Sequence, residues 1–434
     1  MLEESEESED RNCNITTFHD NEFYVAIMDE DLGRIDDMSR KHGSNFLIKI
    51  RDGGPIKVMH KGLAILPLHL AASYRRVKSM QSLLSAGVDP EMRDQQGRTA
   101  LHLVISAWPY ILSTWPKPRS KFQTAVSSKQ QRAEACLRLL CDHGANVNAE
   151  VEGESRQTSL HLTVRYAALP AVQILASYGA DVNAVDGTGM TALHMASGIL
   201  HKDIMASLIR QGADVNKGMK QSGNTPLHLA GSAATMRNTK TSEEDMSCIS
   251  ELLEQGAEPD AVNKAGRTPL QEACSGGNEA LVDLLLRYGA DINKLTRAGE
   301  NCLFLFLNHM PNVRHGSLLV KLLSLTSPFT VYNQDGLLPS TLMLTRFCKQ
   351  RLQLLNLTQQ PRRLQDICKI QIYLKRGRGK REELRKILPE RLYDFVFNCW
   401  QNTHSISFVA DDETDSFSNL SDFSAAWHLS VMPN

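Results

Sequence analysis

This 434-residue sequence contains five histidines in a repeated sequence context, and we consider first whether they form a metal site or a catalytic centre. Imidazole side chains bind metal ions and transfer protons near neutral pH, so a group of them can form a metal site or an acid–base centre. Here each one occupies the same place in a short apolar word, spelled LPLHLAA, TALHLV, TSLHLT, TALHMAS or TPLHLA. The five are His69, His102, His161, His194 and His228. Because they share one slot of a repeated word, we interpret them as structural residues and not as a catalytic or metal centre.

Cysteines offer the second possible chemistry. Cys136, Cys141 and His143 lie near one predicted helix end, where two cysteines so spaced could share a helix face. No complementary pair of ligands with zinc-site spacing accompanies them, so we interpret both cysteines as core residues. The sequence also contains no Gly-rich phosphate loop, nucleophile elbow or paired-carboxylate signature. It therefore predicts a protein that is not an enzyme, with no catalytic residue, no bound metal and no cofactor.

The overall composition is that of a soluble globular protein. The formal net charge is -1 and 42% of the residues are hydrophobic, so no polyanion is favoured as a partner and no nucleic acid is expected. The cysteines are scattered and odd in number, the N-terminus is acidic, and no apolar run approaches the roughly 18 residues of a membrane span. We predict a reduced, cytoplasmic protein with no membrane partner. A basic loop at 376–381 leaves nuclear import open, although a solvated loop between helices is favoured.

The words that contain the histidines recur at a nearly constant interval. Their first residues are separated by 33, 59, 33, 34, 43 and 33 positions. The words begin at Leu66, Thr99, Thr158, Thr191, Thr225, Thr268 and Asn301. A second word that begins with glycine, such as GADVN, precedes or follows most of them at a fixed place in the unit. A period of this length predicts a solenoid of stacked helical repeats.

The spelling of each unit predicts a turn followed by two short helices. A threonine such as Thr191 suits an N-cap, because its hydroxyl accepts a hydrogen bond from an unpaired backbone N–H of the first turn. Pro226 and Pro269 follow their threonines at the first helical position, where no N–H donor is needed. Gly212 suits the left-handed residue that ends a second helix. One helix pair cannot bury its own apolar side, so neighbouring pairs must stack.

This two-word pattern resembles ankyrin repeats over roughly residues 62–300. The resemblance implies an all-α solenoid of helix-turn-helix repeats with β-turn tips, followed by a small C-terminal helical segment. It also implies a structural hydrogen-bonding role for the five histidines, and recognition of an unknown protein ligand by the turn tips and the exposed side of the first helices. Carried over by position, the predicted ligand surface contains Gln95, Gln96, Arg98, Arg165, Tyr166, Thr188, Met190, Lys264, Arg267 and Arg297.

Two insertions interrupt the repeats, at 108–132 and 232–246. Both fall between the first and second helix of a unit, so we expect them to project from the same edge of the solenoid. The first contains four aromatic residues: Trp108, Tyr110, Trp115 and Phe122. These side chains are costly to leave in water, so they either fold back on the solenoid edge or form a loop that binds a partner.

The remaining segments flank the repeats. We predict an N-terminal helical cap and loop over residues 21–61, and a degenerate repeat with a C-terminal cap over residues 301–360. Residues 1–20 and 401–434 are acidic and are predicted to be disordered. In the second of these tails, acidic and aromatic residues are interspersed, a pattern that also suits a short peptide that docks on binding.

Residues 361–400 follow a different helical pattern, in which Leu364, Cys368 and Ile372 lie four positions apart on one helix face. With the loop KRGRGK and the pair LP behind it, this order resembles the suppressor-of-cytokine-signalling (SOCS) box of ankyrin-and-SOCS-box proteins. The resemblance implies that the three residues bind the elongin B/C adaptor. It further implies a cullin-facing segment formed by Leu388, Pro389, Leu392, Phe395 and Val396.

The box departs from its family pattern in two places. Lys386 and Ile387 replace the usual first Leu-Pro pair, and Arg363 stands where Ser, Thr or Pro is usual, so binding to a cullin has weaker support than binding to the adaptor. Two functions therefore remain open. The chain is either a substrate-recognition subunit of a cullin-RING ubiquitin ligase, or a cytoplasmic scaffold with no ubiquitin link, in which residues 361–400 form a helical lid on the solenoid.

Overall fold

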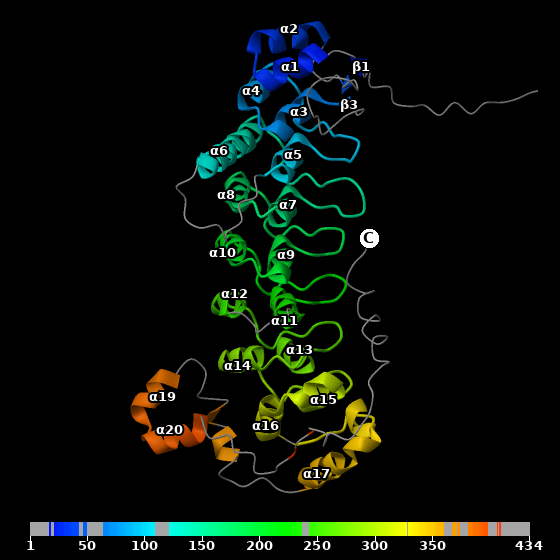
Figure 1. Cartoon of the computed structure of the whole chain (residues 1–434), viewed down its shortest axis with the longest axis vertical. Coiled ribbons are helices and arrows are strands. Elements are labelled where there is room, and N and C mark those ends of the chain that lie inside the picture. Colours follow the sequence, from blue (N-terminus) through cyan, green and yellow to red (C-terminus); the bar gives the residue numbers. More distant parts are fainter. Residues whose placement is uncertain are drawn as a thin grey trace, which may run out of the picture.

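The computed structural model describes residues 17–18, 21–42, 47–49, 64–108, 121–236, 243–327, 329–359, 367–370, 372–373, 381–397, 406 and 408. Within them, the chain forms pairs of helices stacked in two columns along one long axis (Figure 1). This arrangement confirms the predicted all-α solenoid. A small sheet, which the sequence pattern did not predict, lies beside the N-terminal end of the stack (Figure 1).

The inner column contains the helices that begin at the repeated word. They are α3 (Pro67–Tyr74), α5 (Ala100–Ser106), α7 (Ser159–Arg165), α9 (Ala192–Ile199), α11 (Pro226–Met236), α13 (Pro269–Ser275) and α15 (Cys302–Asn308). Each packs on the next helix in the column. The leucine two positions after the start of each word is fully buried, from Leu68 in the first to Leu303 in the last. Buried small residues such as Ala196 and Ala273 let neighbouring helices approach closely.

The outer column contains the second helix of each unit. Its members are α4 (Val77–Ser85), α6 (Lys121–Asp142), α8 (Leu169–Ser177), α10 (Lys202–Arg210), α12 (Glu243–Glu254), α14 (Glu279–Arg287) and α16 (Gly316–Leu325). Their apolar faces meet the inner column in one continuous core that extends from Phe23 to Phe408. No single pair contains a complete core, so each depends on its neighbours for burial.

The N-terminal end is covered by α1 (Asn21–Asp29) and α2 (Leu32–His42), as expected for a capping pair. Phe23, Ile27 and Ile35 are fully buried there, and the hydroxyl of Ser79 in α4 donates to the backbone oxygen of Ile27 at 2.8 Å. The sheet has the order β1 (Thr17–Phe18), β2 (Leu47–Lys49), β3 (Ala64–Ile65), with β1 parallel and β3 antiparallel to β2. Most of the predicted tail 1–20 lies outside the described residues.

Helices extend into both insertions. Within the first insertion, which spans residues 108–132, α6 already begins at Lys121. The prolines of this insertion all precede position 121, and the segment behind them contains neither Pro nor Gly, so the helix can extend backwards from the repeat. At the second insertion, α11 continues to Met236 and α12 begins at Glu243, so most of 232–246 is helical extension.

The C-terminal end is closed by η1 (Met310–Arg314), η2 (Ser340–Met343), η3 (Thr345–Phe347) and α17 (Cys348–Gln359). Within the predicted C-terminal cap, residues 340–343 form the short 3-10 segment η2 and no α-helix, because Pro339 and the extended Leu344 leave too few residues to nucleate one. Phe408 packs edge-on against Phe347 with ring centroids 5.2 Å apart. Two further helices, α19 (Arg381–Ile387) and α20 (Glu390–Phe397), lie beside this end, on the side of the outer column (Figure 1).

Candidate protein-binding surface

The segments that join one unit to the next extend from one edge of the solenoid as narrow hairpins (Figure 1). We call them fingers. In chain order they span 89–98, 146–157, 181–190, 214–224, 258–267, 291–300 and 329–337. Because the fingers follow one another along the stack, they form a row that is as long as the repeat array.

One polar side chain at the base of a finger fixes its conformation. Oδ1 of Asp186 accepts hydrogen bonds from the backbone N–H groups of Thr188 and Met190 at 2.9 and 3.0 Å, and the Asp186 N–H donates to the Met190 carbonyl at 2.9 Å. Asp94, Asn263, Thr296 and Asn333 make the equivalent side-chain contacts in four other fingers. Short Asx and Thr side chains suit this local bonding. The residue at the base therefore determines the backbone conformation of its finger.

Glycine at the tip lets neighbouring fingers touch. Gly266 has a φ of 78°, and a Cβ placed there would lie 2.9 Å from the backbone nitrogen of Arg297 in the next finger. Only glycine combines this left-handed conformation with so close an approach. Backbone hydrogen bonds join the fingers at the same level, for example from Lys264 N–H to the Ser222 carbonyl at 2.8 Å. The row is thus a connected surface.

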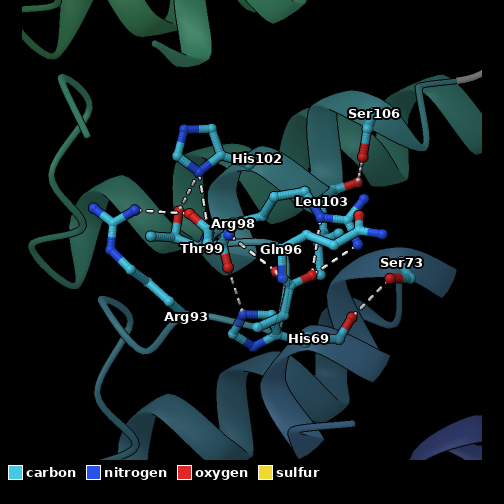
Figure 2. Close-up of polar contacts among 11 residues, drawn as sticks. His69, Ser73, Arg93, Gln96, Arg98, Thr99, His102, Leu103 and Ser106 are labelled. Atoms are coloured by element: carbon cyan, nitrogen blue, oxygen red, sulfur yellow. Dashed lines mark hydrogen bonds and ion pairs between the residues drawn. The ribbon is translucent and has the colours of Figure 1, made fainter. Parts of the chain in front are cut away.

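The repeated histidines lie beneath the fingers and join successive units. His161 Nε2 is 2.9 Å from the Met190 carbonyl, and His194 Nε2 is 3.1 Å from the Asn224 carbonyl. His69, His102 and His228 make the same contact with the units that follow them, at 3.0 to 3.1 Å. Figure 2 shows the ring of His69 below the Arg98 carbonyl and the ring of His102 beside Thr99.

The other ring nitrogen determines the tautomer. The backbone N–H of Thr99 donates to Nδ1 of His102 at 3.0 Å, and the equivalent contacts of His161, His194 and His228 are 3.2 to 3.3 Å long. A nitrogen that accepts an N–H cannot also carry a proton, so these four rings are neutral and donate through Nε2. Burial lowers the pKa of His102 to about 4, and burial likewise lowers the pKa values of His161, His194 and His228.

Two units replace the histidine without losing the contact. In the sixth word, Gln271 accepts from the Thr268 N–H through Oε1 at 2.9 Å and donates through Nε2 to the Lys294 carbonyl at 2.8 Å. In the seventh, Nδ2 of Asn301 donates to the Thr330 carbonyl at 2.8 Å. The slot therefore requires a donor to the next unit, which supports a structural role and not a catalytic one.

The predicted ligand surface divides into two groups by exposure. Gln95, Gln96, Arg165, Lys264 and Arg297 are exposed. The half-buried residues are Arg98, Tyr166, Thr188, Met190 and Arg267. Several of these have structural contacts of their own, since Arg98 is paired with Asp94 at 2.7 Å and the Thr188 hydroxyl donates to Asp186 at 2.6 Å. The first group is the one that is free to contact a ligand.

Sequence reasoning missed a further set of finger residues. Exposed apolar side chains occur directly before the base residue of four fingers: Val185, Val262, Leu295 and Tyr332. Lys220 is exposed and Lys217 and Lys294 are half-buried on neighbouring fingers. An alignment of the units on the base residue of each finger, in addition to the helix word, would have shown that an apolar residue recurs directly before the base.

The aromatic insertion and the C-terminal box are only partly described. Trp108 is buried against the solenoid core, Tyr110 and Trp115 lie outside the described residues, and the side chain of Phe122 does so too. In the box, Leu364 lies outside the described residues, Cys368 is exposed and Ile372 is half-buried. The cullin-facing set is mixed: Leu388 is half-buried, Pro389 and Leu392 are exposed, Val396 is buried and the Phe395 side chain lies outside the described part.

The two cysteines near the end of α6 are core residues with weakly reactive thiols. Burial raises the pKa of Cys136 to about 12 and that of Cys141 to about 11, so both stay protonated and weakly nucleophilic. No group of three or more His, Cys, Asp and Glu side chains that could hold a metal ion occurs among the described residues. In the same part of the chain, the helices are too short or too polar to span a bilayer.

Comparison with family models agrees with this geometry. Residues 160–241 and 238–315 match the model "Ankyrin repeats (3 copies)", and residues 68–107 match "Ankyrin repeats (many copies)". These segments hold the words, fingers and stacked helix pairs described above. Residues 68–107 and 160–315 are therefore ankyrin repeats.

The similar proteins differ in size and kind. The chain is 26% identical over 275 residues to human ankyrin repeat and SOCS box protein 16, an alignment that covers 54% of this chain and 60% of that protein. It is 28% identical over 255 residues to the mouse B-cell lymphoma 3 protein homolog, covering 57% of this chain and 49% of that protein. The chain thus spans only about half to three fifths of these two relatives.

Among solved structures, the ankyrin repeat domain of Bcl-3 matches 56% of this chain and 93% of that chain, with 24% identity and a TM-score of 0.45. The human ASB11 ankyrin repeat domain matches 55% of this chain and 90% of that chain, with 22% identity and a TM-score of 0.41.

The histidine contacts predict a loss of stability in mild acid. A lowered pKa means that the unfolded chain binds protons near pH 6.5 and the folded chain only at lower pH, so stability is full above about 6.5 and is lost as the pH falls towards 4. For His102 alone the loss is on the order of 3 kcal/mol. The variant His102→Gln should keep both hydrogen bonds, as Gln271 does, and should unfold with a weaker pH dependence than the wild type in urea titrations from pH 7.5 to 4.

The matched control is His102→Ala, which leaves the Ala149 carbonyl and the Thr99 N–H without this partner and should cost about 1–3 kcal/mol at pH 7.5. Equal pH dependence in the wild type and in His102→Gln would contradict the assigned tautomer.

Proposed function

We propose that this chain is a non-enzymatic protein-interaction module that grips a protein ligand with its fingers and the exposed side of its inner helices. The observation that carries the proposal is the connected row of fingers, whose bases are fixed by hydrogen bonds and whose tips expose polar and charged side chains. A surface of this kind is ordered before binding, so less conformational entropy is lost when a partner docks. The module supplies recognition and proximity, with no bond-making residue of its own.

The exposed members of the predicted surface supply the contacts. Gln95 and Gln96 offer amide donors and acceptors, and Arg165, Lys264 and Arg297 offer positive charge at three levels of the stack. Arginine in particular forms planar, paired hydrogen bonds with carboxylates and is enriched at protein interfaces. A ligand that crosses several units can therefore engage several of these residues together.

The combined substitution Arg165→Glu, Lys264→Glu and Arg297→Glu should remove the main contacts while the buried core stays intact. Central interface residues cost more than about 1.4 kcal/mol each, so we expect proximity labelling of the specific partner set in cells to fall at least tenfold. The matched control carries Arg132→Glu, Arg138→Glu and Arg287→Glu, all exposed on outer helices, and should label the same partners as the wild type. The proposal is wrong if the first variant is folded and labels the wild-type set unchanged.

A narrower function is substrate recognition for a cullin-RING ubiquitin ligase through residues 361–400. One support is the similarity to a protein named for its SOCS box. Another is the exposure of Ile367, Cys368, Ile387 and Leu392, since an apolar face open to solvent suits a partner helix. In addition, Ile370 and Val396 are buried outside the solenoid core, as expected if this segment has a small core of its own.

The competing hypothesis is that residues 361–400 form a lid on the solenoid of a scaffold without a ubiquitin link. Tyr373 packs against the solenoid core, which agrees with a lid. However, Leu342, Phe347, Leu354, Ile406 and Phe408 already cover that end of the core. This cover reduces the need for a further lid, so the adaptor-binding hypothesis is the better supported of the two.

Co-purification with elongin B/C separates the two hypotheses. The wild-type chain should recover the adaptor, and the double variant Leu364→Gln, Cys368→Gln should recover at least tenfold less, because both residues belong to the predicted contact face. The control Leu352→Gln, which changes an exposed apolar residue on α17 outside the box, should recover as much adaptor as the wild type.

Circular dichroism of the same samples reports on folding. A folded wild type that recovers no adaptor would exclude the ligase function. Thermal unfolding of the double variant at a clearly lower temperature would instead support the lid.

A further inference from the structure

The tips of the fourth to sixth fingers carry positive charge. These tip segments, 217–224, 262–267 and 294–299, which we call the basic fingers, contain no acidic residue, whereas Asp214, Glu258, Asp260, Asp291 and Glu300 lie in the remaining parts of the same fingers. Their cations are Lys217, Lys220, Lys264, Arg267, Lys294 and Arg297. The second finger, nearer the N-terminal end, is opposite in character, since residues 150–157 contain three glutamates and one arginine. The row of fingers therefore has an acidic segment near its N-terminal end and a basic segment in its fourth to sixth fingers.

Contacts within the solenoid leave most of this charge uncompensated. The ammonium group of Lys217 donates to the Asn183 carbonyl at 2.7 Å, and that of Lys294 donates to the Asp260 carbonyl at 3.1 Å. A backbone carbonyl fixes the position of a lysine but carries no net charge. Arg267 differs, because it pairs with the carboxylate of Glu272 at 3.5 Å. The basic fingers are thus pre-positioned to receive carboxylates from another segment.

Exposed apolar side chains occupy one register on two of the basic fingers, 262–267 and 294–299, and on the fingers 181–190 and 329–337. Val185, Val262, Leu295 and Tyr332 are 42%, 54%, 57% and 38% exposed. Each directly precedes the finger base, and the four bases make the same backbone hydrogen bond across the finger, at 2.9 to 3.1 Å. Equivalent backbone geometry places them at equivalent points, so they form an apolar ladder along the row. Together with the cations, the ladder fits a segment that is both acidic and aromatic.

Such a segment exists in this chain. Residues 409–434 contain no Lys or Arg and carry five acidic residues: Asp411, Asp412, Glu413, Asp415 and Asp422. Large apolar residues are interspersed with them and follow them: Phe417, Leu420, Phe423, Trp427 and Leu429. The composition is complementary to the basic fingers in charge and to the ladder in apolar character.

The segment 409–434 also begins at the C-terminal end of the solenoid, the half that contains the basic fingers. Phe408 packs on Phe347 of η3, which follows the last finger in the chain, so the tail begins at the C-terminal end of the stack. The 26 residues of 409–434 span up to about 85–95 Å when extended. Stacked helices lie about 10 Å apart, so the basic fingers lie within roughly 40 Å of that end. The tail is long enough to cover all three.

We propose that residues 411–429 bind in cis to the basic fingers and the apolar ladder, with the carboxylates on the cations and the aromatic residues on the ladder. The inference rests on the proposed function, because it makes the tail an internal competitor for the ligand surface. A tethered segment has an effective concentration of about 1 mM, so a tail with an intrinsic Kd of about 100 μM occupies its site roughly nine tenths of the time. An external ligand must displace it and therefore binds about tenfold more weakly.

The test uses a fluorescein-labelled peptide of residues 409–434 and the full chain. Anisotropy titrations should show about tenfold tighter binding to a tail variant, Phe417→Ala, Phe423→Ala and Trp427→Ala, than to the wild type, because the altered tail no longer occupies the site. Adding Lys264→Glu and Arg297→Glu to the tail variant should weaken peptide binding at least tenfold. Adding Arg138→Glu and Arg287→Glu on outer helices should leave it unchanged.

A photo-crosslinking amino acid at position 423 of the full chain gives an independent measurement. Crosslinks within one molecule to 217–224, 262–267 or 294–299 are expected. Crosslinks only between molecules, or only to other segments, would overturn the proposal, as would equal peptide affinity for the wild type and the tail variant. These readouts involve no external partner, so their failure is separate from the loss of partner labelling that would contradict the protein-interaction function.

Discussion

The hydrogen bond from a neutral side chain in one unit to a backbone carbonyl in the next is the contact on which the rest of the structure depends. Each repeat is too small to bury its own core, so its stability comes from its neighbours. His161, His194 and their counterparts join the units at the place where the inner helix meets the finger. One imidazole ring thus accepts a hydrogen bond at the start of its own helix and donates one to a backbone carbonyl in the next finger. The repeat interface and the binding surface are built from the same bond.

This coupling explains why the surface can be both ordered and variable. The base of each finger is held by Asp, Asn or Thr, and backbone hydrogen bonds join its tip to the neighbouring finger, so the fold constrains the tip backbone more than the exposed tip side chains. The charge of these side chains changes from acidic in the second finger to basic in the fourth to sixth within one fold. Under the proposed function, recognition uses these exposed side chains, such as Gln96 and Arg297.

The repeat words predicted most of the fold. Thr191 and His194 mark the start of an inner helix in the sequence, and the structure places both where the words require. The words are less informative where context decides: α6 extends back to Lys121 because residues 121–132 contain neither Pro nor Gly, and the C-terminal cap contains the 3-10 segment η2 because Pro339 restricts the backbone there. The ligand surface was harder to predict. Arg98 and Thr188 have side chains that suit ligand binding, but in the structure they bind Asp94 and Asp186 of their own fingers. The repeat pattern does not indicate which finger side chains are exposed.

The imidazole nitrogens give the most direct test of this account. In a ¹⁵N-labelled sample near pH 7, two-dimensional NMR of the histidine rings should show His102, His161, His194 and His228 as neutral rings protonated at Nε2, with Nε2 protons that exchange slowly because each is donated to the next unit. Rings protonated at Nδ1, or charged imidazolium rings at that pH, would contradict the central role given to this bond.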